Sequence, residues 1–251
     1  MIESDEALAA RLAESAMDAL LALRAEGRLE GKALGAAADS AANRLILDGL
    51  CRQRPDDGLL SEESPDDCER LRHARVWIVD PLDGTREYVA GRNDWAVHVA
   101  LAVDGQARLG AVAVPEKGVF RSDRMAGKPR KSGRSRPLML VSRSRPPEYA
   151  GLLAAAIGAD VAQLGSAGAK AMAVVAGDAD IYVHSGGQHE WDNCAPAAVA
   201  GAAGLHVSRL DGSRLVYNRP SPFLPDLLIC RRDLAKSVLE AASSLSACDR
   251  G

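Results

Sequence analysis

Apolar side chains recur every three or four residues through the first part of the chain. Over residues 4–26, Ala, Leu and Met at this spacing alternate with Glu and Arg, and Gly27 follows, so the pattern predicts an amphipathic helix. A second helix is expected over residues 39–54, with Asp39 in the position of an N-cap. The chain is therefore expected to open with two amphipathic helices.

The pattern then changes from helical spacing to short apolar runs. Residues 58–61 form a strand-like stretch, and the fully apolar residues 76–79 stop at Asp80, as a buried strand would. Residues 95–103 form another strand-like and mostly apolar run, and a turn at residues 104–105 leads into residues 109–114, which predicts a β-hairpin. The first half is thus read as two helices followed by a sheet.

The second half alternates between predicted strands and predicted helices. The expected strands are 138–141, 161–164, 181–184 and 205–208, and the expected helices are 147–157, 167–176, 192–203 and 233–245. Such alternation is typical of α/β folds. The prediction is an α/β protein whose N-terminal half is α+β.

Two halves of one domain are expected, an α+β half over residues 1–136 and an α/β half over residues 137–251. They meet at the basic stretch of residues 121–136, which lacks apolar periodicity. This stretch is interpreted as a solvated loop, and it could also help to draw in an anionic substrate.

Composition narrows the class of protein. The chain has 251 residues, 47% of them hydrophobic, and a formal net charge of −3, which argues against a general binder of nucleic acid or anionic membranes. No apolar run is long enough for a membrane span, and the acidic N-terminal stretch does not resemble a signal peptide. A cytoplasmic location is expected. The five cysteines are scattered without a C-x-x-C pair, so disulfides and structural zinc are not expected.

The first candidate site lies where the buried strand ends, in the sequence Val-Asp-Pro-Leu-Asp-Gly-Thr. The strand delivers Asp80 and Asp83 to its exit, and Gly84 and Thr85 begin what resembles a helix. Two carboxylates this close repel each other unless a cation lies between them, and hard oxygen ligands suit Mg²⁺. An N-capping turn with acids at a helix N-terminus is the structural alternative.

Two further acids lie at comparable positions. Glu62 follows a predicted strand, and Asp192 opens a predicted helix. Taken singly, Glu62 could be an exposed acid and Asp192 an N-cap. Taken together, the acids form a ligand set for two or three Mg²⁺ ions.

Such clusters carry out phosphoryl hydrolysis, because the metal acidifies a water molecule and neutralises the leaving oxygen. Backbone N–H groups at Thr85 and Asp192 would bind the phosphate, and Thr85 with Asp39 could orient the attacking water. The haloacid dehalogenase phosphatases use an Asp-x-Asp motif instead. Two residues separate Asp80 from Asp83 here, which is the wrong register for that motif, so that chemistry is not expected.

Three motifs carry a resemblance to a known family: Glu62-Glu63, Asp80-Pro81-Leu82-Asp83-Gly84-Thr85, and Trp191-Asp192 followed by Ala195-Pro196-Ala197 and Ala203-Gly204. In this order and spacing, the chain resembles the inositol monophosphatase superfamily over about residues 39–204. The resemblance implies a layered α-β-α-β-α fold and Mg²⁺-dependent, lithium-sensitive hydrolysis of phosphate monoesters.

The resemblance also implies roles for individual residues. It implies metal ligands at Glu62, Asp80, the Leu82 carbonyl, Asp83 and Asp192, and catalytic roles for Asp39, Glu62 and Thr85, with Asp39 paired to Thr85. A homodimer is implied by the family alone.

Within the superfamily, four stretches resemble the CysQ group of 3′(2′),5′-bisphosphate nucleotidases, and its actinobacterial members in particular. The stretches are residues 60–63, 94–98, 165–172, and 186–188 ahead of Trp191. That group removes the 3′-phosphate of adenosine 3′,5′-bisphosphate in sulfate assimilation.

Several residues are candidates for substrate binding. Ser166 and Lys170 follow a Gly-rich turn, and Ser142 begins a Ser-Arg-Ser-Arg stretch that could contact a second phosphate. A plain glycine-rich connection and a polar loop are the alternatives. The expected substrate-binding set is Asp83, Gly84, Thr85, Ser142, Ser166, Lys170 and Asp192.

The resemblance has one departure that bears on substrate. Inositol-cleaving members carry an acidic residue several positions before the last metal-binding Asp, and Glu190 lies too close to Asp192 to match it. The expected activity is therefore 3′-phosphate removal from a nucleotide bisphosphate by direct in-line attack of water, without a phosphoenzyme. An inositol monophosphatase or fructose 1,6-bisphosphatase of the same fold is the first alternative, and a noncatalytic nucleotide-binding regulator is the second.

Overall fold

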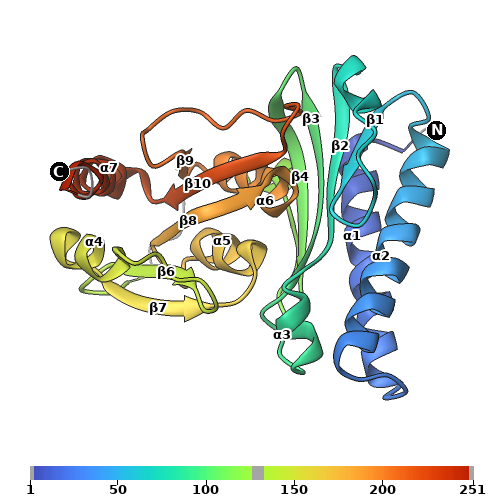
Figure 1. Cartoon of the computed structure of the whole chain (residues 1–251), viewed down its shortest axis with the longest axis horizontal. Coiled ribbons are helices and arrows are strands. Elements are labelled where there is room, and N and C mark those ends of the chain that lie inside the picture. The colour runs from blue at the N-terminus through green and yellow to red at the C-terminus, as the bar shows by residue number, and fades with distance from the viewer. Residues whose placement is uncertain (1–2, 126–132, 249–251) are drawn as a thin grey trace.

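A computed structural model describes residues 3–125 and 133–248 of the chain. Within these residues, two five-stranded sheets and seven α-helices stack in alternating layers of helix, sheet, helix, sheet and helix (Figure 1). The layered α/β fold expected from the sequence is confirmed. No helix within the described residues is long and apolar enough to cross a membrane.

The first two layers come from the N-terminal part of the chain. Helices α1 (Asp5–Ala25) and α2 (Gly31–Gln53) pack on one face of a sheet with the strand order β1-β2-β3-β4-β5. Its strands are β1 (Gly58–Ser61), β2 (Arg75–Asp83), β3 (Ala96–Val103), β4 (Gln106–Val114) and β5 (Gly118–Arg121). Strand β1 runs parallel to β2, and all other neighbours are antiparallel.

Strand β2 is buried on both faces, which explains its continuous apolar run. Successive side chains of a strand point to opposite faces, so Trp77 and Val79 pack toward α1 and α2, whereas Val76 and Ile78 belong to the core on the opposite face. The strand therefore carries its final carboxylates into the interior of the molecule.

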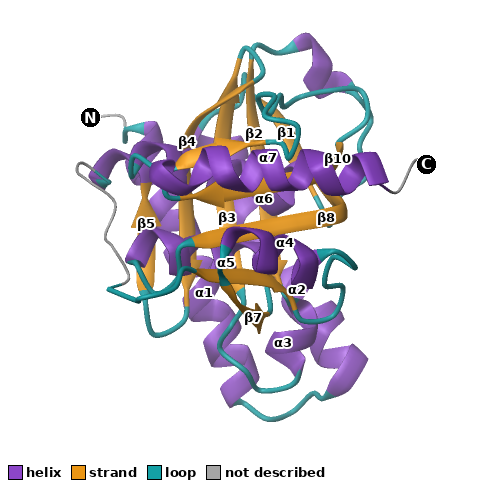
Figure 2. Cartoon of the chain, turned by 90° about the vertical axis from the view of Figure 1, so that its left-hand side faces the viewer, coloured by secondary structure: helices purple, strands orange, loops and turns teal. Residues whose placement is uncertain are grey.

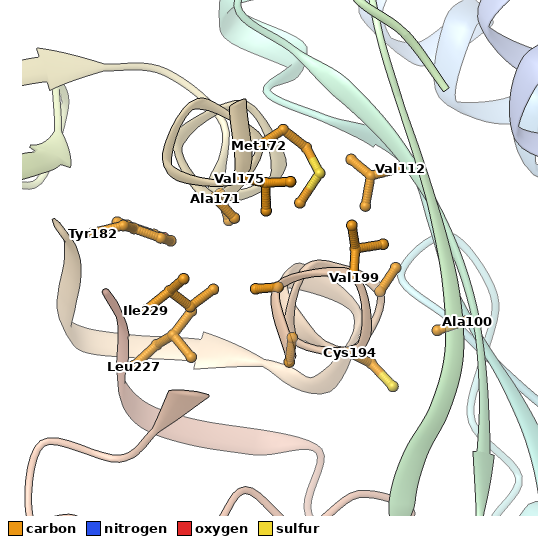
Figure 3. Close-up of a cluster of buried hydrophobic side chains, with 14 of the residues drawn as sticks. Ala100, Val112, Ala171, Met172, Val175, Tyr182, Cys194, Val199, Leu227 and Ile229 are labelled. Carbon is orange, nitrogen blue, oxygen red and sulfur yellow. The ribbon is translucent and has the colours of Figure 1, made fainter. Parts of the chain in front are cut away.

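Helices α5 (Ala167–Ala176) and α6 (Glu190–Ala202) form the middle layer between the two sheets. Figure 3 shows Met172 and Val199 from these helices pointing toward one another and toward Val112 of β4. At Gly110 of β4, an added Cβ would lie 2.6 Å from the carbonyl oxygen of Ala195. Small residues thus let helix and sheet approach closely.

The second sheet has the strand order β7-β6-β8-β10-β9, and α4 (Ala150–Ile157) and α7 (Arg232–Cys248) cover its outer face (Figure 2). Its strands are β6 (Leu138–Ser142), β7 (Asp160–Leu164), β8 (Ile181–His189), β9 (His206–Ser208) and β10 (Phe223–Cys230). Strand β6 is parallel to β7 and β8, and β10 is antiparallel to β8 and β9.

Three shorter elements complete the fold: α3 (Thr85–Val89) and the 3-10 helices η1 (Glu69–Arg72) and η2 (Ser122–Arg124). Strands β5 and β10 were not expected from the sequence. Pro225 lies inside β10 and argues against a strand in the sequence. The structure accommodates it with a register shift between Leu224 and Asp226.

Several predicted boundaries were wrong. Helix α2 begins at Gly31 rather than Asp39, because packing against β2 and α3 stabilises its first two turns, which contain Gly31 and Gly35. Asp39 is therefore not an N-cap. Strand β8 continues to His189 through two glycines with positive φ, and α6 begins at Glu190, so that Asp192 is the third residue of its helix.

The division into halves at residues 136 and 137 stays a prediction. Although α6 follows β8 of the second sheet, it packs closely on β3 and β4 of the first. Most of the basic stretch expected to form a loop falls on residues 126–132, which lie outside the described residues.

Candidate active site

Carboxylates from two distant parts of the chain meet at the end of β2. One oxygen from each of Asp80, Asp83 and Asp192 lies within 4.8 Å of the others. Asp80 and Asp83 are buried at 1% and 8% exposure, and Asp192 is partly buried at the start of α6. The structure thus brings together three of the predicted metal ligands.

The turn after β2 depends on Gly84, whose φ is +96°. An added Cβ there would lie 3.2 Å from Trp95 and 3.3 Å from Ser166, so both the backbone conformation and the close approach favour glycine. Thr85 follows as the first residue of α3. The turn places the Leu82 carbonyl and the Thr85 hydroxyl beside the carboxylates.

Asp80 has one satisfied and one unsatisfied oxygen. Its Oδ1 accepts a hydrogen bond of 3.1 Å from the Leu82 N–H, while its buried Oδ2 has no hydrogen-bond partner among the described residues. Because buried polar atoms in proteins are nearly always partnered, an orphaned carboxylate oxygen points to a cation.

Asp83 is held by the turn before α5. Its Oδ2 accepts hydrogen bonds from the Ser166 hydroxyl and from the Gly168 N–H, the latter at 2.7 Å. Ser166 has a φ of +49°, a conformation that costs a residue other than glycine about 1–3 kcal/mol. The serine that donates a hydrogen bond to Asp83 therefore lies in a strained turn.

His98 of β3 lies between the Asp83 carboxylate and the backbone of Trp191, the residue before Asp192. Its Nδ1 lies 3.0 Å from the Trp191 carbonyl, and its Nε2 lies 3.3 Å from Asp83 Oδ2. Gly168 leaves space for the imidazole ring, because an added Cβ at this glycine would be 2.1 Å from that Nε2. His98 packs where β3, α5 and α6 meet, and sequence reasoning assigned it no role.

The acids raise one another's pKa values. Burial, followed by the charges of Asp192 and Asp83, raises the pKa of Glu62 to about 8. Burial and the charge of Asp83 raise the pKa of Asp192 to about 6. Burial and the neighbouring acids raise the pKa of Asp80 well above its usual value. Crowded carboxylates of this kind are relieved by a divalent cation.

The residues present fit a hard cation. Carboxylate and carbonyl oxygens are the ligands that Mg²⁺ and Ca²⁺ prefer. Asp80, Asp83 and Asp192 supply the carboxylates, with the Glu62 carboxylate and the Leu82 carbonyl facing the same cavity.

Thr85 and Asp39 are in contact, as predicted from the family resemblance. The Thr85 hydroxyl lies 3.3 Å from Asp39 Oδ1 and 3.2 Å from the Leu82 carbonyl oxygen. Burial and the nearby Glu63 raise the pKa of Asp39 to about 6, although the hydrogen bond from Thr85 lowers it. Asp39 reaches this position from the middle of α2.

The predicted metal ligands and Thr85 line one cavity of about 260 Å³, whereas Asp39 and His98 are not part of its wall. Its wall contains the predicted residues Glu62, Asp80, Leu82, Asp83, Gly84, Thr85, Ser142, Ser166, Lys170 and Asp192. It also contains Ser144 and Arg145 of the predicted Ser-Arg-Ser-Arg stretch, and residues to which the sequence gave no role: Arg86, Glu87, Tyr182, His184 and Gln188. The Ser-Arg-Ser-Arg stretch was predicted to contact a second phosphate, whereas Tyr182 and His184 carry no sequence signal beyond their strand.

Lys170 is buried at 3% exposure and is committed to the protein. Its ammonium donates to the carbonyl oxygens of Leu164, Gly165 and Ser166 and lies 5.1 Å from the centre of the Tyr182 ring. Burial lowers its pKa to about 8, against the opposing charges of the nearby acids. Three carbonyl acceptors match its three N–H donors, so Lys170 fixes the turn at residues 164–166 in this structure.

The two arginines of the Ser-Arg-Ser-Arg stretch differ. Arg143 forms ion pairs with Glu87 at 2.9 Å and Asp94 at 2.5 Å. Arg145 is exposed and forms no ion pair within the described part of the chain. Arg145 is close enough to Asp192 for its charge to lower the pKa of that acid. Of these two arginines, Arg145 is the one whose guanidinium is available to bind an anion.

Comparisons with known proteins agree with this geometry. The model of the inositol monophosphatase family matches residues 1–246. A 3′-phosphoadenosine 5′-phosphate phosphatase of Mycobacterium leprae is 49% identical over 250 residues, which cover 94% of this chain and 92% of that protein. The 3′(2′),5′-bisphosphate nucleotidase CysQ of Escherichia coli is 35% identical, covering 75% of this chain and 81% of the relative.

Solved structures match in fold. CysQ from Bacteroides thetaiotaomicron has a TM-score of 0.77 and 24% identity, covering 90% of this chain and 96% of that one. An inositol monophosphatase from Zymomonas mobilis has a TM-score of 0.77 and 23% identity, covering 95% of this chain and 97% of the other.

Proposed function

This chain belongs to the inositol monophosphatase family, and we propose that it is a Mg²⁺-dependent phosphatase that converts adenosine 3′,5′-bisphosphate to AMP. The observation that carries the reaction is the meeting of three carboxylates in one cavity, with a buried Asp80 oxygen that lacks a partner among the described residues. The nucleotide substrate is supported by the mycobacterial and enterobacterial relatives, whose names specify this chemistry.

Five groups would hold two or three Mg²⁺ ions: the carboxylates of Glu62, Asp80, Asp83 and Asp192, and the Leu82 carbonyl. When bound, the ions supply an acidified water and neutralise charge on the phosphate. The protein holds the ligand set in place through the Leu82 N–H on Asp80 and through Ser166 and Gly168 on Asp83.

Thr85 and Asp39 would orient the attacking water. The Thr85 hydroxyl has two acceptors within 3.3 Å but one proton, so its lone pairs remain able to accept a hydrogen bond from water. Asp39, with a pKa of about 6, can hold a proton near neutral pH. Gly84 and Thr85 line the same cavity, and their backbone N–H groups would donate to the phosphate.

The second phosphate of the substrate would bind at Arg145, with the Ser142 and Ser144 hydroxyls beside it on the cavity wall. Arg143 is excluded from this role because Glu87 and Asp94 neutralise it. A guanidinium that can form paired hydrogen bonds suits a phosphate.

The structure gives a reason to prefer a nucleotide over inositol phosphate. Glu190 is fully buried and faces away from the cavity, where it accepts hydrogen bonds from the Asn218 and Arg219 N–H groups at 2.6 and 2.9 Å. It is therefore not available to bind sugar hydroxyls. The cavity wall before Asp192 instead carries His184 and Gln188.

The test compares phosphate release from adenosine 3′,5′-bisphosphate, inositol 1-phosphate and fructose 1,6-bisphosphate at saturating Mg²⁺. We expect kcat/KM for the nucleotide to exceed that for the other two by about tenfold or more, equivalent to roughly 1.4 kcal/mol. A tenfold preference for inositol phosphate would overturn the proposal. A cytoplasmic location and a homodimer stay predictions.

A further inference from the structure

Asp94 lies outside the acidic cluster, in the connection between α3 and β3. It contacts residues near its own segment and residues from loops of the second sheet. Its Oδ2 accepts hydrogen bonds from the Gly165 N–H at 2.8 Å and from Arg143 Nη2 at 2.5 Å. Its Oδ1 accepts from Arg92 Nε at 2.7 Å. The side chain is 12% exposed. The proposed chemistry does not use this carboxylate.

Arg143 extends these contacts. Besides Asp94, it binds Glu87 Oε1 of α3 at 2.9 Å. Arg143 follows β6, and Gly165 begins the turn between β7 and α5. Asp94 and Glu87 therefore fasten two loops of the second sheet to the segment that follows β2.

The fastened turn is the one that holds Asp83. Gly165 precedes Ser166, and the Ser166 hydroxyl and Gly168 N–H both donate to Asp83 Oδ2. The positive φ of Ser166 can persist only if its surroundings fix it. An added Cβ at Gly165 would lie 2.4 Å from Glu87 Cγ, so the turn is pressed directly against α3.

We propose that Asp94 is a positioning residue that clamps the Gly165 N–H and Arg143 to the first half and thereby fixes the two hydrogen bonds that orient Asp83. The inference rests on the proposed metal-dependent function only in taking Asp83 as a metal ligand. A carboxylate suits the position because its two oxygens can accept all three donors.

The charge of the clamp persists through the physiological range of pH. Burial alone would raise the pKa of Asp94, but hydrogen bonds from Arg92, Arg143 and the Gly165 N–H outweigh it and lower the pKa to about 2. Charge-assisted hydrogen bonds are roughly twice as strong as neutral ones. An amide at this position would accept through one atom only and would lose that gain.

The test is Mg²⁺ binding to the metal-free full-length protein, measured by calorimetry for wild type and Asp94→Asn. We expect about tenfold weaker Mg²⁺ binding in the variant, the lower end of the effect of residues that orient metal ligands. The Mg²⁺ concentration for half-maximal turnover should rise in parallel. Arg92→Met is the matched control, because it removes a partner of Asp94 but keeps the bonds to Gly165 and Arg143. Its Mg²⁺ affinity should stay within about twofold of wild type.

Wild-type Mg²⁺ affinity in Asp94→Asn would overturn the clamp, as would equal weakening in Arg92→Met. If Asp94→Asn does not fold, Arg143→Met decides, since it removes one of the two contacts across the halves. Weaker Mg²⁺ binding than in Arg92→Met supports the clamp, and binding equal to that control refutes it. A wild-type protein that binds no Mg²⁺ would instead refute the proposed function.

Discussion

Two groups of carboxylates lie on either side of the turn at residues 165–168, and they differ in what neutralises them. Among the described residues, no arginine or lysine forms an ion pair with the cavity acids Asp80, Asp83 and Asp192. On the other side, arginines bind both Asp94 and Glu87. The pKa of Glu62 in the cavity is raised to about 8, whereas that of Asp94 is lowered to about 2.

The difference teaches how this chain reserves acids for a metal. Arg92 and Arg143 form ion pairs with carboxylates that have a structural role. Elsewhere Arg75 does the same with Asp5 and Asp57. A cluster left unpaired beside them carries an electrostatic cost that an added cation relieves. The proposed metal site is therefore the place where neighbouring carboxylates lack arginine partners.

The largest expected effect comes from removing a cavity charge. Asp83→Asn weakens a metal ligand and should lower kcat/KM by roughly 10³-fold, in line with the several kcal/mol that a metal contributes. The fold should survive, because an amide retains the shape of the side chain. Steady-state kinetics and circular dichroism on the purified variant check this.

Asp57→Asn is the matched control, since it removes an arginine-bound carboxylate outside the cavity. It should lower stability and leave kcat/KM close to wild type. Near wild-type turnover in Asp83→Asn would show that the metal assignment is wrong.

The next effect concerns metal and pH. Glu62 and Asp192 have folded-state pKa values of about 8 and 6, above their ordinary values of 4.5 and 3.8. The metal-free folded state therefore binds protons that the unfolded state releases, and this contribution to stability is lost as pH rises toward 8. Mg²⁺ competes with those protons, so the stabilisation it provides should grow from pH 5 to pH 8.

Thermal unfolding with EDTA or Mg²⁺ measures this increment. At a concentration 100 times Kd, we expect Mg²⁺ to add about 2.7 kcal/mol at pH 8 and much less at pH 5. An increment that is equal at both values of pH would contradict the view that the acids are unpaired without metal.

The buried Lys170 ammonium should matter for stability, because it donates to three carbonyl oxygens and lies over the Tyr182 ring. Lys170→Met removes the ammonium that donates to the carbonyl oxygens of residues 164–166 and should lower the free energy of unfolding by about 2 kcal/mol. Urea unfolding measures it, with the exposed Lys236→Met as control at within about 0.5 kcal/mol of wild type. Equal stability of the two variants would refute the role given to Lys170.

The smallest expected effect concerns Arg145 and the second phosphate of the substrate. Arg145→Met should reduce the preference for adenosine 3′,5′-bisphosphate over adenosine 3′-monophosphate by about tenfold, or roughly 1.4 kcal/mol, because the second phosphate loses its partner. Arg52→Met, which removes an exposed charge on α2, should leave this ratio unchanged. A ratio in Arg145→Met equal to that of wild type would place the second phosphate elsewhere.

The sequence predicted the layers of the fold and the acidic residues that meet at the end of β2. It did not predict which neighbouring side chains in a loop form ion pairs and which stay unpaired. Val-Trp-Ile-Val followed by Asp80 is a local pattern, and burial on both faces of β2 follows from it. Arg143 and Arg145 are equivalent in the sequence, and only the position of Asp94 and Glu87 distinguishes them. Such differences arise from tertiary contacts, which no local pattern encodes.

Helix starts were also beyond local signals. Asp39 was placed correctly beside Thr85 by the family resemblance but wrongly as an N-cap by its residue type. The glycines at the start of α2 and the proline within β10 argued locally against elements that packing stabilises.

The place of α6 has a consequence for the order of events in folding. It follows a strand of the second sheet but packs against β3 and β4 of the first, and it carries the last carboxylate of the cluster. The chain must close this long loop before the ligand set exists, and contacts so distant in sequence form slowly. Metal capture is then a late event that reports completed assembly, and a nascent chain that lacks α6 would have only part of the charge needed to take up an ion.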